Sequence, residues 1–217
     1  MSIQSNLSEI KQTLHSDCKL IAVSKRKPSS DILEAYSAGQ RDFGENYIQE
    51  LVDKKEALPN DIFWHFIGHL QRNKVKYIAP FVHLIHAVDS IKLLQEINKQ
   101  AIKNDRNIAV LIQIHIAQEE TKFGFSPEEF FTLVEDRAFD EFKNIELKGL
   151  MAMASNTEDK EQVNTEFSKI KALFDQAKKV YPSMSEISTG MSKDYTIAMN
   201  NGSTYVRLGT SIFGQRD

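Results

Sequence analysis

Short apolar segments alternate with longer segments of helical periodicity along nearly the whole sequence. The apolar segments are rich in β-branched residues, and the longer ones repeat apolar residues every three to four positions. Eight strands are expected, at residues 19–24, 41–46, 62–68, 82–89, 108–116, 145–153, 184–189 and 204–209. Helical segments separate nearly all of them, and a further helix is expected at residues 2–15.

This alternation constrains the fold more than any other feature of the sequence. Strands joined by helical crossovers form a parallel sheet, and a repeat of eight is typical of a closed (β/α)8 barrel. The alternative is an open, doubly wound sheet, which would favour a G-x-G-x-x-G turn after the first strand. That turn is absent from the sequence. We therefore predict one α/β domain over residues 1–217, a single TIM barrel with an extra N-terminal helix.

The composition of the chain bears on its binding partners and on its location in the cell. The 217 residues carry a formal net charge of -3, which gives no reason to expect a nucleic acid. The one cysteine, Cys18, cannot form an intrachain disulfide and fits a reducing compartment. The sequence contains neither a long apolar segment nor an apolar leader. We expect a cytoplasmic protein without a membrane segment.

Polar residues gather where the expected strands end, which is where barrels of this type hold their active sites. Small and hydroxyl residues form "STGMS" at residues 188–192, and "RLGT" occupies residues 207–210. Loops after the seventh and eighth strands commonly bind phosphate through helix N-termini and hydroxyl groups. Alternatively, Ser188 or Ser192 is simply a helix N-cap. Together the two motifs favour a phosphate site.

Lys25 ends the first expected strand, in "LIAVSKRKP". Strand alternation places Lys25 on the same face as Val23, so Lys25 faces the barrel if Val23 does. A lysine forms a Schiff base only as the neutral amine, which burial and the nearby cations Arg26 and Lys27 favour. A solvated cluster of charges at a strand end is the alternative. A lysine beside a phosphate site indicates a phosphorylated aldehyde, of which pyridoxal phosphate is the common one.

Eight motifs carry a resemblance to a known family. They are "AVSKRKP", "DFGENYIQEL", "WHFIGHLQRNKV", "HAVDS", "KFGF", "GLMAM", "STGMSKDYTIAM" and "VRLGTSIFG", in this order. Together they resemble the YggS/PROSC family of pyridoxal phosphate-binding proteins from Lys19 to Gly214. The family's fold is similar to the N-terminal barrel of alanine racemase, in agreement with the eight expected strands.

The resemblance implies a set of cofactor-binding residues. Lys25 carries pyridoxal 5'-phosphate as a Schiff base, and Arg207 faces the pyridine nitrogen. Thr189 and Leu208 depart modestly from the family's usual residues and change neither assignment. The remaining candidates are Asn46 near the ring, Ser192, Gly209 and Thr210 around the phosphate, and additionally Ser188, Met191 and His65.

Arg207 bears on whether the protein is an enzyme. A permanently cationic arginine disfavours protonation of the pyridine nitrogen and so makes the cofactor a weak electron sink. The resemblance implies storage or delivery of pyridoxal phosphate in vitamin B6 and amino-acid homeostasis, with apo-enzymes as possible recipients, and we expect a monomer without clear turnover. The alternatives are a small amino-acid racemase with Tyr47, His65 or water as second base, a sugar phosphate-binding barrel, and a Schiff-base aldolase.

Three further groups in the sequence are candidates for a role. Lys27 could hold a second cofactor or assist its release, and Lys122 could lie by the barrel mouth, but we expect both to be solvated surface lysines. His65 and His69 are four residues apart, a spacing that ligates zinc on a helix. Here Gly68 and the aromatic residues favour a strand and loop, so we expect no metal site.

Overall fold

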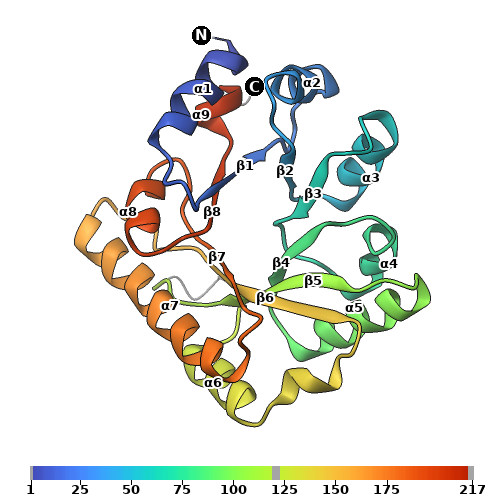
Figure 1. The fold of residues 1–217 in the computed structure, drawn as a ribbon, viewed down its shortest axis with the longest axis vertical. Helices are drawn as coiled ribbons and strands as arrows, with labels where there is room; N and C mark the ends of the chain where they lie inside the picture. The colour runs from blue at the N-terminus through green and yellow to red at the C-terminus, as the bar shows by residue number, and fades with distance from the viewer. Residues whose placement is uncertain (1, 119–122, 215–217) are drawn as a thin grey trace.

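The computed structural model describes residues 2–118 and 123–214, and in it eight parallel strands form a closed barrel (Figure 1). Each strand pairs with the next, and the last pairs with the first. The strands are β1 (Lys19–Val23), β2 (Asp42–Glu45), β3 (Phe63–Phe66), β4 (Leu84–Val88), β5 (Ile108–Ile114), β6 (Ile145–Ala152), β7 (Glu186–Ser188) and β8 (Tyr205–Leu208). The predicted (β/α)8 barrel is confirmed.

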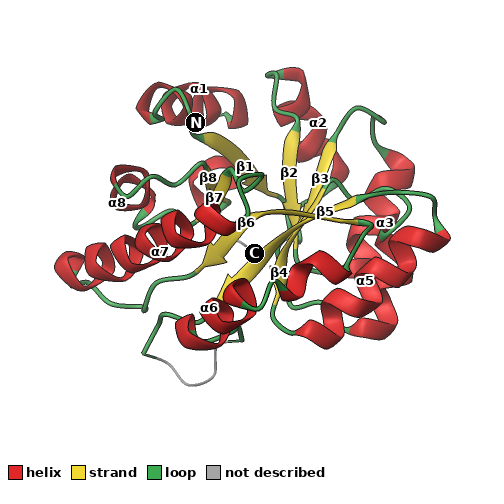
Figure 2. Cartoon of the chain, turned by 60° about the horizontal axis from the view of Figure 1, so that its bottom comes forward, coloured by secondary structure: helices red, strands yellow, loops and turns green. Residues whose placement is uncertain are grey.

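Helices surround the strands on the outside (Figure 2). The α-helices are α1 (Ile3–Thr13), α2 (Ser29–Ser37), α3 (Ile48–Ala57), α4 (Val75–Ile78), α5 (Ile91–Lys103), α6 (Pro127–Glu135), α7 (Lys160–Val180), α8 (Tyr195–Asn200) and α9 (Thr210–Phe213). Two 3-10 turns, Arg72–Lys74 and Ala138–Glu141, join them. The expected N-terminal helix is α1, which packs beside α9 (Figure 1). None of the described helices has the length and apolar character needed to cross a bilayer.

Side-chain capping explains where several helices begin. Ser126 precedes α6 and accepts a hydrogen bond from Glu129 N, while the Glu129 carboxylate accepts one from Ser126 N. Ser90 caps α5 by accepting a hydrogen bond from Leu93 N, and Asp159 caps α7 by accepting from Glu161 N and Gln162 N. Such caps satisfy backbone N–H groups that have no partner within the helix. They therefore fix the positions at which the chain leaves the barrel mouth.

The apolar core has two main parts. The larger lies between the strands and the surrounding helices and includes Trp64, Phe66 and Phe130. The smaller lies inside the barrel, and its buried members are Ile21, Leu84, Ala87, Leu111, Met151 and Tyr205. The barrel is thus a packed body whose usable space is at its rim.

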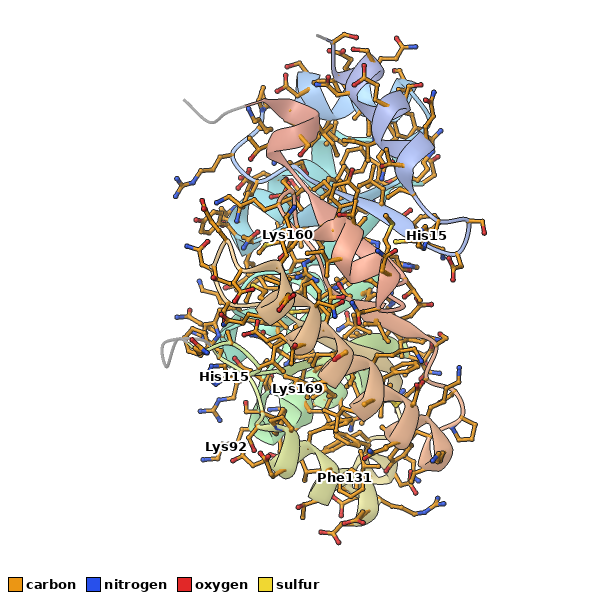
Figure 3. All side chains as sticks on the ribbon, turned by 90° about the vertical axis from the view of Figure 1, so that its left-hand side faces the viewer. His15, Lys92, His115, Phe131, Lys160 and Lys169 are labelled. Atoms are coloured by element: carbon orange, nitrogen blue, oxygen red, sulfur yellow. The ribbon has the colours of Figure 1, made fainter. Side chains whose placement is uncertain are left out.

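The two ends of the barrel face opposite sides of the molecule (Figure 3). Lys92, His115 and Lys160 come after β4, β5 and β6, and they lie on one side. His15 comes before β1 and lies on the other. The loops that follow the strands therefore meet at one mouth.

Candidate functional site

A cavity of about 790 Å³ lies at the carboxyl ends of the strands. This volume is in the range of small-molecule sites. Its walls come from the loops after β1, β2, β3, β6, β7 and β8. Among its lining residues are the predicted Lys25, Asn46, Met191, Ser192, Arg207, Gly209 and Thr210. The structure therefore brings together residues that are distant in the sequence.

Lys25 lines this cavity together with Val23, as strand alternation predicts. Ser24, between them, is fully buried and turned the other way, and its hydroxyl donates to Glu45 Oε1 over 2.6 Å. Arg26 is exposed and donates from Nη2 to the Tyr47 hydroxyl over 3.2 Å. Of the basic residues Lys25, Arg26 and Lys27, Lys25 is the one that lines the cavity, on the same side as Val23.

Three buried or partly buried charges support the loop that carries Lys25. Lys54 Nζ donates to Glu45 Oε1 over 2.7 Å, to Glu50 Oε1 over 2.6 Å and to the Ser24 carbonyl over 2.8 Å. Glu50 also accepts from the backbone N–H of Arg26, whose φ of 60° is left-handed. A left-handed non-glycine residue needs such support. The cluster thus holds the backbone on both sides of Lys25.

Burial dominates the electrostatics of this cluster. It raises the pKa of the Glu45 carboxyl, while the charge and hydrogen bond of Lys54 act in the opposite direction. Glu45 Oε2 is buried without a hydrogen-bond partner among the described residues. Lys54 is therefore the group that makes an ionised Glu45 tolerable at this depth.

Asn46 follows β2 and supplies a test of whether the cavity fits a polar ligand. Its Oδ1 atom is buried and has no hydrogen-bond partner among the described residues. Buried polar atoms are nearly always paired, so an orphaned one beside a cavity indicates a ligand or water partner. The side chain suits the position near a cofactor ring that the resemblance implies.

The loops after β7 and β8 form the side of the cavity expected to hold phosphate. Ser192 lies after β7, while Gly209 and Thr210 lie after β8 at the start of α9. Neither Ser188 nor Ser192 is a helix N-cap, since Asp194 occupies that position before α8. The Asp194 carboxylate accepts from Met191 N over 2.6 Å and shapes the loop.

Gly190 is needed for this loop to pack. Its φ is +88°, and a Cβ atom added there would lie 2.6 Å from Ala198 Cβ and 2.9 Å from Tyr195 Cα. Its carbonyl accepts from Arg207 N over 3.0 Å, which ties the loop to β8. Only glycine combines this conformation with so close an approach of α8.

Arg207 lies on β8 with 6% of its surface exposed. Nη1 donates to both the carbonyl and the hydroxyl of Ser188 over 2.6 Å, and Nη2 donates to the Ala152 carbonyl over 3.1 Å. Burial lowers the pKa of Arg207 to about 10, against the opposing charge of Asp194. The guanidinium is still cationic at neutral pH.

Two of the predicted residues, Ser188 and His65, are not among the cavity-lining residues. Ser188 is fully buried and contacts Arg207. His65 is fully buried on β3, with its ring nitrogens 2.9 Å from His86 Nε2 and 3.0 Å from Asp42 Oδ1. Both side chains lie inside the barrel, below the mouth. His69 has different surroundings, with Asp89 at 3.0 Å and the Phe123 ring stacked on it.

The expectation for Lys27 needs correction, because it is not simply solvated. Its Nζ donates to the Phe213 carbonyl over 3.0 Å at the end of α9, where carbonyl groups lack helical partners. Lys122 lies outside the described residues.

One wall of the cavity was missed in the sequence. The loop between β6 and α7 supplies, among others, Ser155, Asn156, Thr157 and Glu158, and Lys160 lines the cavity from the start of α7. Ser155 N and Oγ donate to the buried Glu166 carboxylate over 2.7 and 2.6 Å. The polar segment "ASNTED" directly after a strand was the available signal.

Comparison with known sequences gives a consistent result. Residues 1–217 match the family model "Alanine racemase, N-terminal domain". The chain is 40% identical over 232 residues to the "Pyridoxal phosphate homeostasis protein" of Haemophilus influenzae, covering all of this chain and 97% of that one. It is 39% identical over 212 residues to the human protein of that name, covering 92% of this chain and 77% of that one.

Solved structures agree on the fold. PipY of Synechococcus elongatus, solved without PLP, superimposes with a TM-score of 0.93 at 30% identity, covering 98% of this chain and all of that one. PipY has also been solved with PLP bound, with a TM-score of 0.89 at 30% identity, and coverage of 98% and 100%. An alanine racemase of Clostridium difficile shares the fold at 16% identity with a TM-score of 0.84, covering 99% of this chain and 57% of that one. The chain belongs to the alanine racemase N-terminal domain family, within the group of pyridoxal phosphate homeostasis proteins.

Proposed function

We propose that the chain binds pyridoxal 5'-phosphate as a Schiff base on Lys25 and acts in intracellular vitamin B6 and amino-acid homeostasis by storing or delivering the cofactor. The observation that carries this proposal is the single cavity onto which Lys25, Asn46 and Arg207 converge. The similar protein PipY has been solved with PLP bound, which supports the choice of cofactor.

Each residue has a role that its chemistry supports. The Lys25 amine would hold the cofactor through its aldehyde, with loss of water. The Asn46 Oδ1 atom, which has no hydrogen-bond partner among the described residues, would serve as an acceptor near the ring. The Ser192 and Thr210 hydroxyls, with the backbone around Gly209, line the side suited to phosphate. Met191 adds apolar surface to the cavity rim, where 41% of it is exposed. Ser188 and His65 lie away from the cavity lining and have no direct role in this proposal.

Arg207 favours a carrier over an efficient catalyst. When bound, pyridoxal phosphate supplies an electron sink whose strength depends on protonation of the pyridine nitrogen. The buried Arg207 guanidinium donates hydrogen bonds and stays charged, so at that nitrogen it opposes a second positive charge. This chemistry suits holding the cofactor better than driving reactions that need a strong sink.

An amino-acid racemase is the second candidate and needs another base in the cavity. Of the groups first considered, His65 is inside the barrel and Tyr47 lines a neighbouring cavity of about 570 Å³. Glu158 and Lys160, however, do line the main cavity. A racemase assay should therefore include variants of these two residues.

The central experiment is an absorbance spectrum of purified protein mixed with pyridoxal phosphate, followed by borohydride reduction and peptide mass spectrometry. Wild type should show the Schiff-base band and a modified Lys25 peptide, and Lys25→Ala should show neither. Lys160→Ala, which removes another lysine from the same cavity, is the matched control and should keep the band. An unchanged band in Lys25→Ala would show that the central assignment is wrong.

Delivery is tested by transfer to an apo-enzyme. Wild type with bound pyridoxal phosphate should restore the activity of a pyridoxal phosphate-dependent apo-enzyme, whether the two proteins are mixed or separated by a dialysis membrane. Faster recovery in the mixture would show that delivery uses direct contact between the two proteins. Sustained turnover of an amino acid that Lys25→Ala abolishes would instead support the racemase. A monomeric state and a cytoplasmic location stay predictions, to be checked by sedimentation and by cell fractionation.

A further inference from the structure

Inside the barrel, below the proposed cofactor site, lies a continuous series of hydrogen bonds between polar side chains. The contacts are 2.6, 2.9, 2.9 and 3.0 Å long. The series, which we call the Arg207–Asp42 series, runs in order through Arg207, Ser188, His86, His65 and Asp42.

The burial of this series is unusual for a barrel interior, which is normally filled by branched apolar side chains. Ser188, His86 and His65 are fully buried, and Arg207 is 6% exposed. Burying polar groups costs free energy unless each is paired, and a paired network fixes the orientation of its members. The series is therefore able to hold its side chains in one arrangement.

The two ends fix the direction of the first and last hydrogen bonds. Arg207 can only donate, so Ser188 Oγ accepts from Nη1. The Asp42 carboxylate can only accept, so His65 Nε2 carries a hydrogen and donates to it. With both imidazoles neutral, His65 Nδ1 can only accept, so the bonds between these ends run from Arg207 toward Asp42.

The internal members follow from this direction. The Ser188 hydroxyl donates to His86 Nδ1, which must be unprotonated. His86 Nε2 then carries the hydrogen and donates to His65 Nδ1. In this arrangement each imidazole carries its one hydrogen on Nε2. Burial, together with nearby charge such as that of Arg207, lowers the pKa of His86.

Aromatic packing holds the two rings in place. The Tyr205 ring meets the His65 and His86 rings edge-on, with centroids 5.5 and 5.9 Å apart. His83 lies beside His65, with centroids 5.2 Å apart. These contacts restrict rotation of the imidazoles, so His86 presents a fixed acceptor to Ser188.

At the mouth, the fixed acceptor determines the position of Arg207. Both hydrogens of Nη1 are used on Ser188, one on its hydroxyl and one on its carbonyl. If Ser188 lost its acceptor, its hydroxyl hydrogen would have to turn elsewhere and would compete with the Arg207 donor. The guanidinium would then be less firmly oriented, because among the described residues it would keep its bonds to the Ser188 and Ala152 carbonyls but not the one to the hydroxyl.

We propose that His86 is a positioning residue for the cofactor site: through its Nδ1 acceptor it fixes the Ser188 hydroxyl, and thereby holds the Arg207 guanidinium against the cofactor ring. The part that concerns the cofactor rests on the proposed function. The part that concerns the direction of the hydrogen bonds does not.

The first test uses wild-type protein without cofactor. NMR of ¹⁵N-labelled histidine should show both His86 and His65 as neutral Nε2–H tautomers at pH 7.5, with assignments from single-histidine variants. Nδ1 protonation at His86 would overturn the proposal, whatever the protein binds.

The second test measures affinity for pyridoxal phosphate and the absorbance maximum of the bound cofactor. His86→Leu, which cannot accept from Ser188, should bind roughly tenfold more weakly, with a shifted maximum. His86→Asn, whose Oδ1 can replace Nδ1 as the acceptor, should restore both. His83→Leu is the matched control, because His83 contacts His65 outside the series.

The outcomes separate the two proposals. If wild type does not bind pyridoxal phosphate, the proposed function fails while the tautomer measurement still decides the direction of the series. If wild type binds and His86→Leu has the same affinity and spectrum, the positioning role is refuted and the proposed function stands. Equal losses in His86→Leu and His86→Asn would also refute it, because the proposal requires rescue by the acceptor.

Discussion

Lys54→Met removes the cation from the charge cluster beneath the Lys25 loop. Methionine preserves much of the apolar stem but leaves Glu45, Glu50 and the Ser24 carbonyl without their Nζ donor. The Glu45 side chain is 0% exposed and that of Lys54 is 7% exposed, so the Glu45 carboxylate would be stranded in a buried site. Breaking such a pair costs about 3–5 kcal/mol. Glu50, at 22% exposure, contributes little to this figure because solvent screens it.

The destabilisation caused by Lys54→Met should depend on pH, and the shift in the Glu45 pKa determines the direction of that dependence. Burial raises the folded-state pKa of Glu45, and Lys54 opposes that shift. Without Lys54 the folded pKa rises further, so the folded variant binds a proton that the unfolded chain has released. The stability of the variant is therefore preserved at acidic pH and lost as pH rises from the ordinary glutamate pKa of 4.5 through the folded-state pKa. The destabilisation should be larger at pH 8 than at pH 5.

Urea unfolding at both pH values measures the effect. Lys171→Met is the matched control, since Lys171 pairs with Asp175 on the surface, where such a pair contributes about 0.3–0.5 kcal/mol. Adding Glu45→Gln to Lys54→Met should recover part of the loss, because it removes the stranded charge. A Lys54→Met cost no greater than that of the control, or equal at the two pH values, would refute this account of the cluster.

Two further predictions concern other parts of the barrel. Gly190→Ala should weaken cofactor binding and lower the free energy of unfolding by at least about 1–2 kcal/mol, because φ is +88° and Ala198 is too close. Gly214→Ala is the control for the backbone strain alone, because Gly214 also has a positive φ, of +76°, but open space around it. A Gly190→Ala loss no greater than that of Gly214→Ala, or unchanged affinity, would contradict this. Burial, with a smaller contribution from Asp17, raises the pKa of Cys18 from 9.0 to about 11, so iodoacetamide at pH 8 should react roughly 100-fold more slowly with folded than with urea-unfolded protein. Equal rates would show an accessible thiolate.

The architecture was predictable because its signals are local and repeated. A short apolar segment in the sequence indicates each strand, and the helical spacing of apolar residues indicates each helix. The eightfold repeat can therefore be predicted without any information on tertiary contacts. The same alternation placed Lys25 beside Val23 at the mouth. Direct chemical motifs such as "STGMS" and "RLGT" then placed Ser192 and Thr210.

Depth inside the barrel was not predictable from alternation. His65 and Ser188 both lie near strand ends, and sequence alone suggested that they reach the cofactor. Strands in a closed barrel tilt and stagger, so residues at similar positions in the sequence lie at different depths. The Glu45–Lys54 pair was invisible for another reason: helix periodicity treats lysine as a surface residue and cannot show that Lys54 reaches the Ser24 carbonyl.

Because β1 pairs with β8, binding of a ligand in the cavity is expected to affect the stability of the closed barrel as well. Lys25 follows the first strand and Arg207 lies on the last, and the two strands align with Ile21 opposite Arg207. The two halves of the site are thus joined across the seam at which the ring of strands closes. A ligand that contacts both halves stabilises the pairing of β1 with β8, because it binds the closed barrel and not one in which these strands have separated. When the cofactor is scarce, β1 and β8 should therefore separate more often than other neighbouring strands. The rate of proteolysis near these two strands would then measure the fraction of the protein that has no cofactor bound.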